Sequence, residues 1–272
     1  LYFIESRCLV EGRGDHYPPG NPIMGKQAIV VIGPAGSGKS TLCRVMQEHY
    51  ATQGRSCHIC NFDPAAEDLA YDPSLDVREL ISLEDAMEGK QLGPNGGLVF
   101  CMEYLMQNTD WLADGLGDFM EDFIVVDMPG QIEVMSHIPV VPTFVEFLKR
   151  EGYFVVVLFL LDALAATADA GKFISGCLFS LSSMVAMDCP FLNVLTKCDL
   201  LPEEFREQGD LEHFCMCDFD YLRLQRLPPK WRQMAGTLSG VISDFNLVSF
   251  RPMDASDVEH ISGLCNAVDD LL

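Results

Sequence analysis

A short glycine-rich segment constrains this chain more than any other part of its sequence. Residues Gly33 to Ser40 read Gly-Pro-Ala-Gly-Ser-Gly-Lys-Ser and fit the pattern G-x-x-x-x-G-K-[ST], with Thr41 next. An apolar run, Ala28 to Ile32, precedes them, and a helix-like stretch begins at Leu42. A strand, a glycine-rich turn and a helix in this order predict a phosphate-binding loop.

Each residue type in the loop suits a nucleoside triphosphate. Glycines let the backbone curl until several N–H groups face the phosphates, and the helix N-terminus adds partial positive charge. We expect Lys39 to reach the β- and γ-phosphates and Ser40 to bind Mg²⁺. The residues expected to line the phosphates are Gly36, Ser37, Gly38, Lys39, Ser40 and Thr41. The alternative is a strand-to-helix turn that binds no ligand.

Length and charge narrow the class of protein further. A chain of 272 residues that is 49% hydrophobic can bury one large α/β core, so we expect one domain. The net charge of −22 leaves no basic surface to neutralise phosphates. Direct binding to nucleic acid or to an anionic membrane is therefore not expected, and protein partners with basic surfaces are.

Three further observations concern location and the start of the chain. Eleven scattered cysteines predict free thiols in a reducing compartment, hence a cytoplasmic protein. The apolar run from Phe154 to Leu161 ends at Asp162, well short of the roughly 20 residues that cross a bilayer, and predicts a buried strand. Residues 1–23 are expected to be a disordered or non-native extension, with Met24 as the natural start.

Beyond the loop, short apolar runs alternate with periodic segments. The runs expected to be strands are Cys57 to Asn61, Phe123 to Val126, Phe154 to Leu161, Phe191 to Leu195 and Leu247 to Phe250. The segments expected to be helical are Asp76 to Met87, Leu98 to Leu112, Val141 to Lys149, Lys172 to Met187 and Trp231 to Phe245. This alternation predicts an α/β P-loop NTPase fold, a mainly parallel sheet with helices on both faces.

One segment interrupts the alternation. Residues from about 203 to 230 are charged and end in Leu227-Pro228-Pro229. We expect a mobile excursion that could carry partner contacts.

A second acidic motif follows the strand that ends at Val126. It reads Asp127-Met128-Pro129-Gly130-Gln131-Ile132-Glu133. An Asp at this position is expected to hold Mg²⁺, and the glycine offers an N–H that can sense the γ-phosphate. Gln131 and Glu133 then stand where a side chain could orient the attacking water. Asp-x-x-Gly alone would more often be a turn, but one strand downstream of a phosphate loop it favours a catalytic site.

Asp63 offers another carboxylate at the same edge of the sheet. It opens Asp63-Pro64-Ala65-Ala66 after the strand Cys57 to Asn61. The same residues also read as a helix N-cap followed by Pro at the first helical position. Both interpretations can hold together.

The segment Thr196-Lys197-Cys198-Asp199 closes the strand that ends at Leu195. An Asp here can accept hydrogen bonds from N1–H and the 2-amino group of guanine, donors that adenine lacks, while the Lys stem packs over the base. An unpaired buried carboxylate is costly, so Asp199 favours GTP over ATP. The alternative is a strand end with no base contact.

Together these motifs resemble those of the GPN-loop GTPases. Gly93-Pro94-Asn95, within an insertion at about 88–98, stands between the Asp63 and Asp127 motifs as in that family. The wording of Gly96 to Tyr104 and of Lys172 to Gly176 is most similar to the third eukaryotic paralogue. The resemblance covers nearly everything from Met24 to Leu272.

The resemblance implies a dimeric, Mg²⁺-dependent GTPase that exchanges GTP and GDP, with self or a paralogous GPN-loop GTPase as partner. It implies that Asn95 crosses into the partner's site and stabilises the transferred phosphate. It further implies contact with RNA polymerase II subunits, a role in assembly and nuclear import of that polymerase, and a cytoplasmic protein that can shuttle to the nucleus. The competing hypothesis is a nucleotide-stabilised scaffold with negligible turnover.

The second base contact has no assignment from the sequence. The guanine-contacting Ser-Ala-Lys expected near the last strand is absent, and Phe250-Arg251-Pro252-Met253-Asp254 stands there.

Cys57 and Cys60 suggest metal delivery. Three residues apart in a strand, however, they point to opposite faces and cannot easily share a metal.

Overall fold

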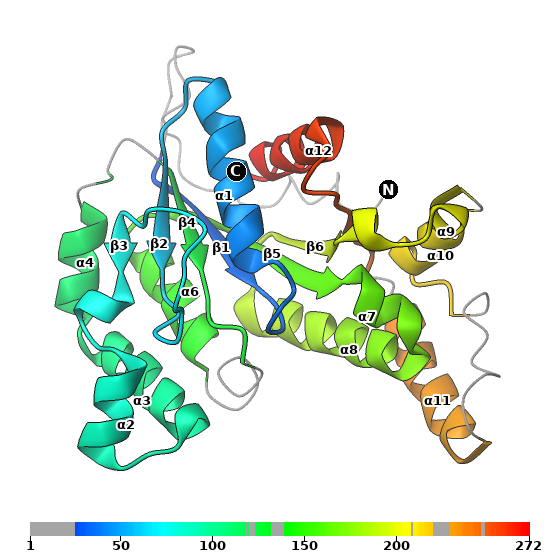
Figure 1. Cartoon of the computed structure of the whole chain (residues 1–272), viewed down its shortest axis with the longest axis horizontal. Helices are drawn as coiled ribbons and strands as arrows, with labels where there is room; N and C mark the ends of the chain where they lie inside the picture. Colours follow the sequence, from blue (N-terminus) through cyan, green and yellow to red (C-terminus); the bar gives the residue numbers. More distant parts are fainter. Residues whose placement is uncertain are drawn as a thin grey trace, which may run out of the picture.

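A computed structural model describes residues 25–117, 119, 123–131, 139–207, 209–219, 229–245 and 248–272. The extension at 1–23, as well as Glu133, lies outside these residues. The described residues form a seven-stranded sheet in the order β3-β2-β4-β1-β5-β6-β7, in which every neighbouring pair is parallel (Figure 1). The strands are β1 (Gln27–Ile32), β2 (Cys57–Asn61), β3 (Leu75–Asp76), β4 (Phe123–Asp127), β5 (Phe154–Asp162), β6 (Phe191–Thr196) and β7 (Phe250–Pro252). The predicted parallel α/β fold is confirmed.

Helices cover both faces of the sheet because alternate residues of the central strand are buried on opposite sides. Ile29 and Val31 pack with α1 (Lys39–Thr52) and α12 (Val258–Asp269). Ala28, Val30 and Ile32 belong to a second apolar cluster. The helices that contribute to that cluster include α3 (Pro94–Gln107), α4 (Thr109–Gly117), α6 (Val140–Arg150) and α8 (Ala170–Met187).

Two predicted helices have different bounds in the structure. The segment Asp76 to Met87 is not one helix, because Asp76 closes β3, a 3₁₀ turn η1 (Val77–Glu79) follows, and α2 (Leu83–Lys90) begins after Ser82. Ser82 Oγ accepts a hydrogen bond from Asp85 N at 3.1 Å, which makes it the N-cap of α2. The segment Leu98 to Leu112 is divided at Asn108 into α3 and α4.

The predicted strand from Leu247 to Phe250 is wrong in its position. The strand β7 runs over Phe250–Pro252, and Leu247 lies outside the described residues. Backbone pairing with β6 accounts for the shift, because Phe250, Arg251 and Pro252 pair with β6 and Met253 N donates to Leu195 O at 2.8 Å. The helix α12 and the two-residue strand β3 had not been predicted.

The excursion predicted at about 203–230 is partly helical in the residues that the structure describes. It contains α9 (Glu203–Glu207) and α10 (Asp210–Cys215), and its last two residues begin α11 (Pro229–Phe245). Phe214 is buried, with its ring centroid 5.0 Å from that of Phe173 on α8. This aromatic contact fixes α10 to the core, while residues 220–228 lie outside the described part of the chain.

Helix α8, which follows α7 (Ala163–Ala168), is long and apolar enough to suit a membrane span by length and composition. Its Phe173, Ile174, Cys177 and Leu181 are buried in the apolar cluster that also contains β5 residues. It is therefore a core helix of this domain.

Candidate nucleotide-binding site

The parallel register brings the predicted motifs to one edge of the sheet. Asp127 at the end of β4 pairs with Val31 of β1 and with Asn61 of β2, and Thr196 at the end of β6 pairs with Asp162 of β5. The loops that follow these strands therefore start side by side at the carboxyl edge, where ligands bind in open α/β sheets.

The glycine-rich segment adopts the predicted curled loop between β1 and α1. Gly36 and Gly38 have positive φ values of 75° and 89°, a conformation that side chains disfavour. A β-carbon on Gly33 would lie 2.4 Å from Leu160 O, so the loop must pass β5 without a side chain at that residue. Lys39, at the start of α1, donates from Nζ to Gly33 O at 3.1 Å and to Pro34 O at 3.2 Å.

A cavity of about 430 Å³ opens in front of the loop. Its lining residues are Ala35, Gly36, Gly38, Lys39, Ser40, Thr41, Asp63, Asp127, Gly130, Gln131 and Lys197. Residues from four separate segments thus meet at one cavity, and nine of the predicted site residues are among them. Glu133 lies outside the described residues.

The charged groups of the cavity influence one another's pKa values. Burial lowers the pKa of Lys39, and the nearby carboxylates of Asp127 and Asp63 act against that shift. Burial raises the pKa of both carboxyl groups, and Lys39 acts against that rise in each. The site therefore brings a buried cation near one buried and one half-buried carboxylate, an arrangement whose charge balance changes when a polyanion or a metal ion enters.

The two carboxylate oxygens of Asp127 differ in their hydrogen bonds. Its Oδ2 accepts a hydrogen bond from Tyr71 Oη at 2.8 Å. Its Oδ1 is buried and has no hydrogen-bond partner among the described residues. The nearby hydroxyls of Ser40 and Tyr71 hold the pKa of Asp127 down against the effect of burial. A buried carboxylate oxygen without a hydrogen-bond donor fits the oxygen ligands that Mg²⁺ prefers.

Asp63 takes part in a turn rather than in a helix. Its Oδ1 accepts a hydrogen bond from Ala65 N at 2.9 Å, as a cap would, but residues 63–66 form a turn and no helix follows. The helix N-cap interpretation is therefore wrong, and Arg78 shows why: its Nη1 donates to Ala66 O at 2.9 Å, which directs that carbonyl away from a helical bond.

The predicted base-binding segment is joined to the phosphate loop. Thr196 Oγ1 lies 2.7 Å from Ser37 O. Lys197 has a positive φ of 59° and its Nζ forms an ion pair with Asp162 Oδ2 at 2.7 Å. Cys198 is buried, and its Sγ donates to Leu195 O at 3.1 Å, so this side chain faces the core. Asp199 is half-buried in the 3₁₀ turn η2 (Cys198–Leu200) and does not line the 430 Å³ cavity.

The structure places a second segment beside the base-binding one. Cys198 N donates to Met253 O at 3.2 Å, which brings the connection between β7 and α12 next to η2. In that connection Ser256 N donates to Asp254 Oδ1 at 2.7 Å. The second base contact, which the sequence left without assignment, is therefore to be sought among residues 253–257.

Asn95 stands apart from the cavity of its own chain. Gly93 is the N-cap of α3, Pro94 its first residue and Asn95 its second, all exposed at the turn between α2 and α3. Figure 1 shows this helix pair extending past the lower end of the sheet. Asn95 is not among the residues that line the cavity.

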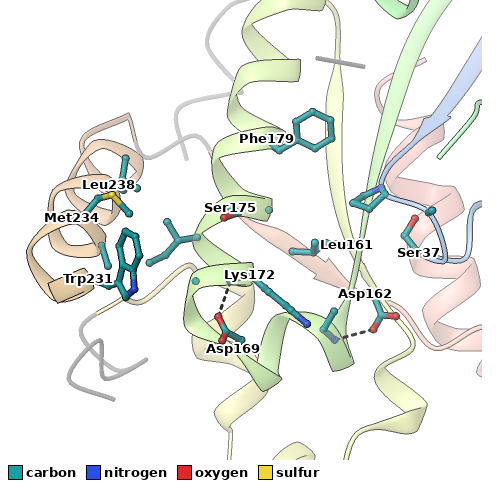
Figure 2. A pocket seen from close by; sticks show the side chains of 17 residues that line it. Ser37, Leu161, Asp162, Asp169, Lys172, Ser175, Phe179, Trp231, Met234 and Leu238 are labelled. Atoms are coloured by element: carbon teal, nitrogen blue, oxygen red, sulfur yellow. Dashed lines mark hydrogen bonds between the residues drawn. The ribbon is translucent and has the colours of Figure 1, made fainter. Parts of the chain in front are cut away.

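A larger apolar cavity of about 1010 Å³ lies on the other side of the phosphate loop. Figure 2 shows Trp231, Met234 and Leu238 of α11 facing α8, with Ser37 of the loop on the opposite side. Ser37 is buried, and its Oγ has no hydrogen-bond partner among the described residues. Ser37 also lines this cavity, although it belongs to the predicted phosphate loop. The helical spacing of Trp231, Met234 and Leu238 was the signal in the sequence that could have indicated this cavity.

Comparisons with known proteins agree with this geometry. A family model described as "Conserved hypothetical ATP binding protein" matches residues 31–272. The chain is 40% identical over 252 residues to GPN-loop GTPase 3 of Candida glabrata, which covers 91% of this chain and 92% of that protein. It is 41% identical over 252 residues to GPN-loop GTPase 3 of Dictyostelium discoideum, with 91% and 87% covered.

Among solved structures, a GTPase in apo form from Pyrococcus abyssi is similar. It superposes with a TM-score of 0.72 at 25% identity and covers 90% of this chain and 97% of its own. Sequence identity over nearly the whole length, the matching fold and the motifs gathered at the cavity all lead to one conclusion. The chain belongs to the GPN-loop GTPase family.

Proposed function

We propose that this protein hydrolyses GTP with Mg²⁺ and that nucleotide binding opens and closes a dimer. The observation that carries the proposal is the convergence of the phosphate loop, Asp63, Asp127 and Gln131 on one cavity of about 430 Å³. A phosphate cradle, a carboxylate with a free oxygen and a side chain able to orient water are the parts that phosphoryl transfer to water requires.

In this proposal Lys39 exchanges its bonds to Gly33 O and Pro34 O for phosphate oxygens. Ser40 and Asp127 hold Mg²⁺, which when bound neutralises charge on the β- and γ-phosphates. Gln131 orients the attacking water, and Asp63 and Glu133 are further candidates for that task. The N–H of Gly130 senses the γ-phosphate, because Gly130 lies directly against Lys39.

Guanine selection is assigned to Asp199. Lys197 reaches the same cavity and is held by Asp162, so its stem is in position to cover a base. Residues 196–199 are tied to the phosphate loop through Thr196 and Ser37, which sets the spacing between the base and the phosphates. GTP and GDP are therefore the proposed ligands.

A second subunit is proposed because Asn95 is exposed and lies off the cavity of its own chain. Pro34 occupies the loop position where related dimeric NTPases carry a second lysine, so another donor must serve the developing charge. Asn95 from a partner, either a second copy or a paralogous GPN-loop GTPase, would supply it. Family resemblance alone supports the proposed cellular role, assembly and nuclear import of RNA polymerase II by a cytoplasmic protein that shuttles to the nucleus.

A single-turnover GTPase assay with excess protein tests the proposal. The protein is measured alone and with a paralogous GPN-loop GTPase, each with Mg²⁺ and with EDTA, and ATP serves as the control nucleotide. We expect GTP-selective, Mg²⁺-dependent phosphate release that increases with dimer concentration. Tight GTP binding without release under any of these conditions would instead establish the scaffold.

A further inference from the structure

Tyr71 contacts the metal-binding carboxylate although no motif contains it. It lies in the connection between β2 and β3, and its hydroxyl donates to Asp127 Oδ2 at 2.8 Å across 56 residues of sequence. Its ring packs against the apolar cluster that contains α1. A phenol in this position has an apolar body fixed by packing and a polar end aimed at the site.

The connection that carries Tyr71 is held at several points. Ser74 N donates to Ile59 O at 2.8 Å, and Asp63 N donates to Asn61 Oδ1 at 3.1 Å. Arg78 Nη1 donates to Ala66 O at 2.9 Å. These bonds anchor the connection on both sides of Tyr71 in the sequence, which limits how far its hydroxyl can move from Asp127.

We propose that Tyr71 is a positioning residue that fixes which oxygen of Asp127 faces the metal ion. A carboxylate joined through one rotatable bond can present either oxygen, and a donor on Oδ2 removes that freedom. The remaining oxygen, Oδ1, is the buried atom that has no hydrogen-bond partner among the described residues. Groups that hydrogen-bond to metal ligands orient them in this way, and their loss typically lowers metal affinity about 10- to 100-fold. The inference rests on the proposed Mg²⁺ site.

The test compares Tyr71→Phe with Tyr153→Phe in the full-length protein. Tyr153 is a matched control, because its hydroxyl also makes a hydrogen bond in the interior, to Leu116 O at 3.0 Å, but away from the cavity. The rate of release of a fluorescent GDP analogue is measured over a Mg²⁺ titration and in EDTA. No catalytic turnover is needed for this readout.

We expect Tyr71→Phe to raise the Mg²⁺ concentration of half-maximal effect about tenfold or more, while release in EDTA stays within about twofold of wild type. Tyr153→Phe should match wild type in both. In an Asp127→Asn background Tyr71→Phe should add less than about a twofold change, because the bond it removes acts through that carboxylate.

A wild-type Mg²⁺ midpoint in Tyr71→Phe would overturn the inference while leaving the metal site in place. Equal losses in Mg²⁺ and in EDTA would also overturn it, since they would show a structural role without metal specificity. If nucleotide release from the wild-type protein did not respond to Mg²⁺, the proposed metal site itself would fail, and the inference with it.

Discussion

Gly130 and Lys39 lie so close together that a β-carbon on Gly130 would come within 2.7 Å of Lys39 Nζ. The same β-carbon would lie 2.7 Å from Ala35 Cα, a backbone atom that cannot easily move. The segment after β4 and the phosphate loop are thus in direct contact, and the contact requires a glycine.

Gly130→Ala should therefore separate these two segments. We expect at least about a tenfold loss of single-turnover GTP hydrolysis, because an error of roughly 1 Å in a catalytic arrangement has effects of that size or larger. Gly263→Ala is the control, since a β-carbon there meets nothing within 4 Å. Equal activity of the two variants would contradict the proposed role of Gly130.

Lys39→Ala should abolish nucleotide binding. Lys39 is the buried cation of the cavity, and backbone N–H groups alone cannot balance the charge of a triphosphate. Fluorescent GTP titration measures the effect, and Lys230→Ala, at an exposed position, serves as the control. Near wild-type affinity in Lys39→Ala would refute the phosphate-loop assignment.

Asp199→Asn should weaken GTP binding and favour xanthosine triphosphate. The 2-oxo group of xanthine needs a donor where the guanine amino group needs an acceptor, and an amide supplies one. Competition binding with GTP, ATP and xanthosine triphosphate measures the change. The base assignment would be wrong if the wild-type protein bound ATP and GTP equally well.

Asn95→Ala should lower turnover by roughly 10²-fold while GTP affinity changes little, because a donor aimed at the transition state acts mainly on the rate. Gln91→Asn is the control, since Gln91 is also exposed, in the same turn, and asparagine tolerates its positive φ of 54°. Single-turnover rates and equilibrium GTP binding separate the two effects.

Mixing Asn95→Ala with Lys39→Ala tests whether Asn95 acts across a dimer. If it does, the Lys39→Ala chain donates its intact Asn95 to the working phosphate loop of the other chain, and activity reappears in one of the two sites. Variants that exchange subunits yet stay inactive would remove the crossing loop from the mechanism. If only a paralogue supports activity, the experiment is run on that pair.

Asp76→Asn should destabilise the fold near the site. Burial would raise the pKa of Asp76, but its hydrogen bonds to Arg78 and Asn61 outweigh burial and lower it. Since the folded pKa lies below the unfolded value of about 3.9, these bonds stabilise the fold above that pH and their contribution is lost as pH falls further. We expect a loss of roughly 1–3 kcal/mol in the free energy of unfolding at pH 7.

Urea unfolding of Asp76→Asn and wild type at pH 7, 5 and 3 measures this contribution. The difference should be the same at pH 7 and pH 5 and smaller at pH 3. Asp114→Asn, at an exposed position on α4, is the control and should cost little at any pH. A difference that persisted unchanged to pH 3 would show that the carboxylate charge is not its cause.

The sequence by itself determined the elements that depend on local chemistry. The phosphate loop could be predicted because its glycine, lysine and serine residues occur at a fixed spacing between a strand and a helix. Asp127 and the segment Thr196 to Asp199 could be predicted because each follows a mainly apolar strand. The alternation of strands and helices was sufficient to predict a parallel sheet with both faces covered.

Local chemistry was insufficient where contacts distant in sequence decide the conformation. The break between Asp76 and α2 depends on bonds of the Asp76 carboxylate with Asn61 and Arg78, and no periodicity in the segment records them. The placement of α10 depends on the contact between the rings of Phe214 and Phe173. A helical pattern or a charged composition is a property of one segment, so it cannot predict a contact between two segments.

Only the tertiary structure decided which side chains share the cavity. Tyr71 and Asp127 are 56 residues apart, and their hydrogen bond exists because parallel pairing of β2 and β4 brings both strand ends to one edge. The same packing placed Ser37 against the apolar cavity and Asn95 away from its own phosphate loop. Sequence thus specified the chemistry of each motif, whereas strand order and register, which arise from packing over the whole chain, set which motifs act together.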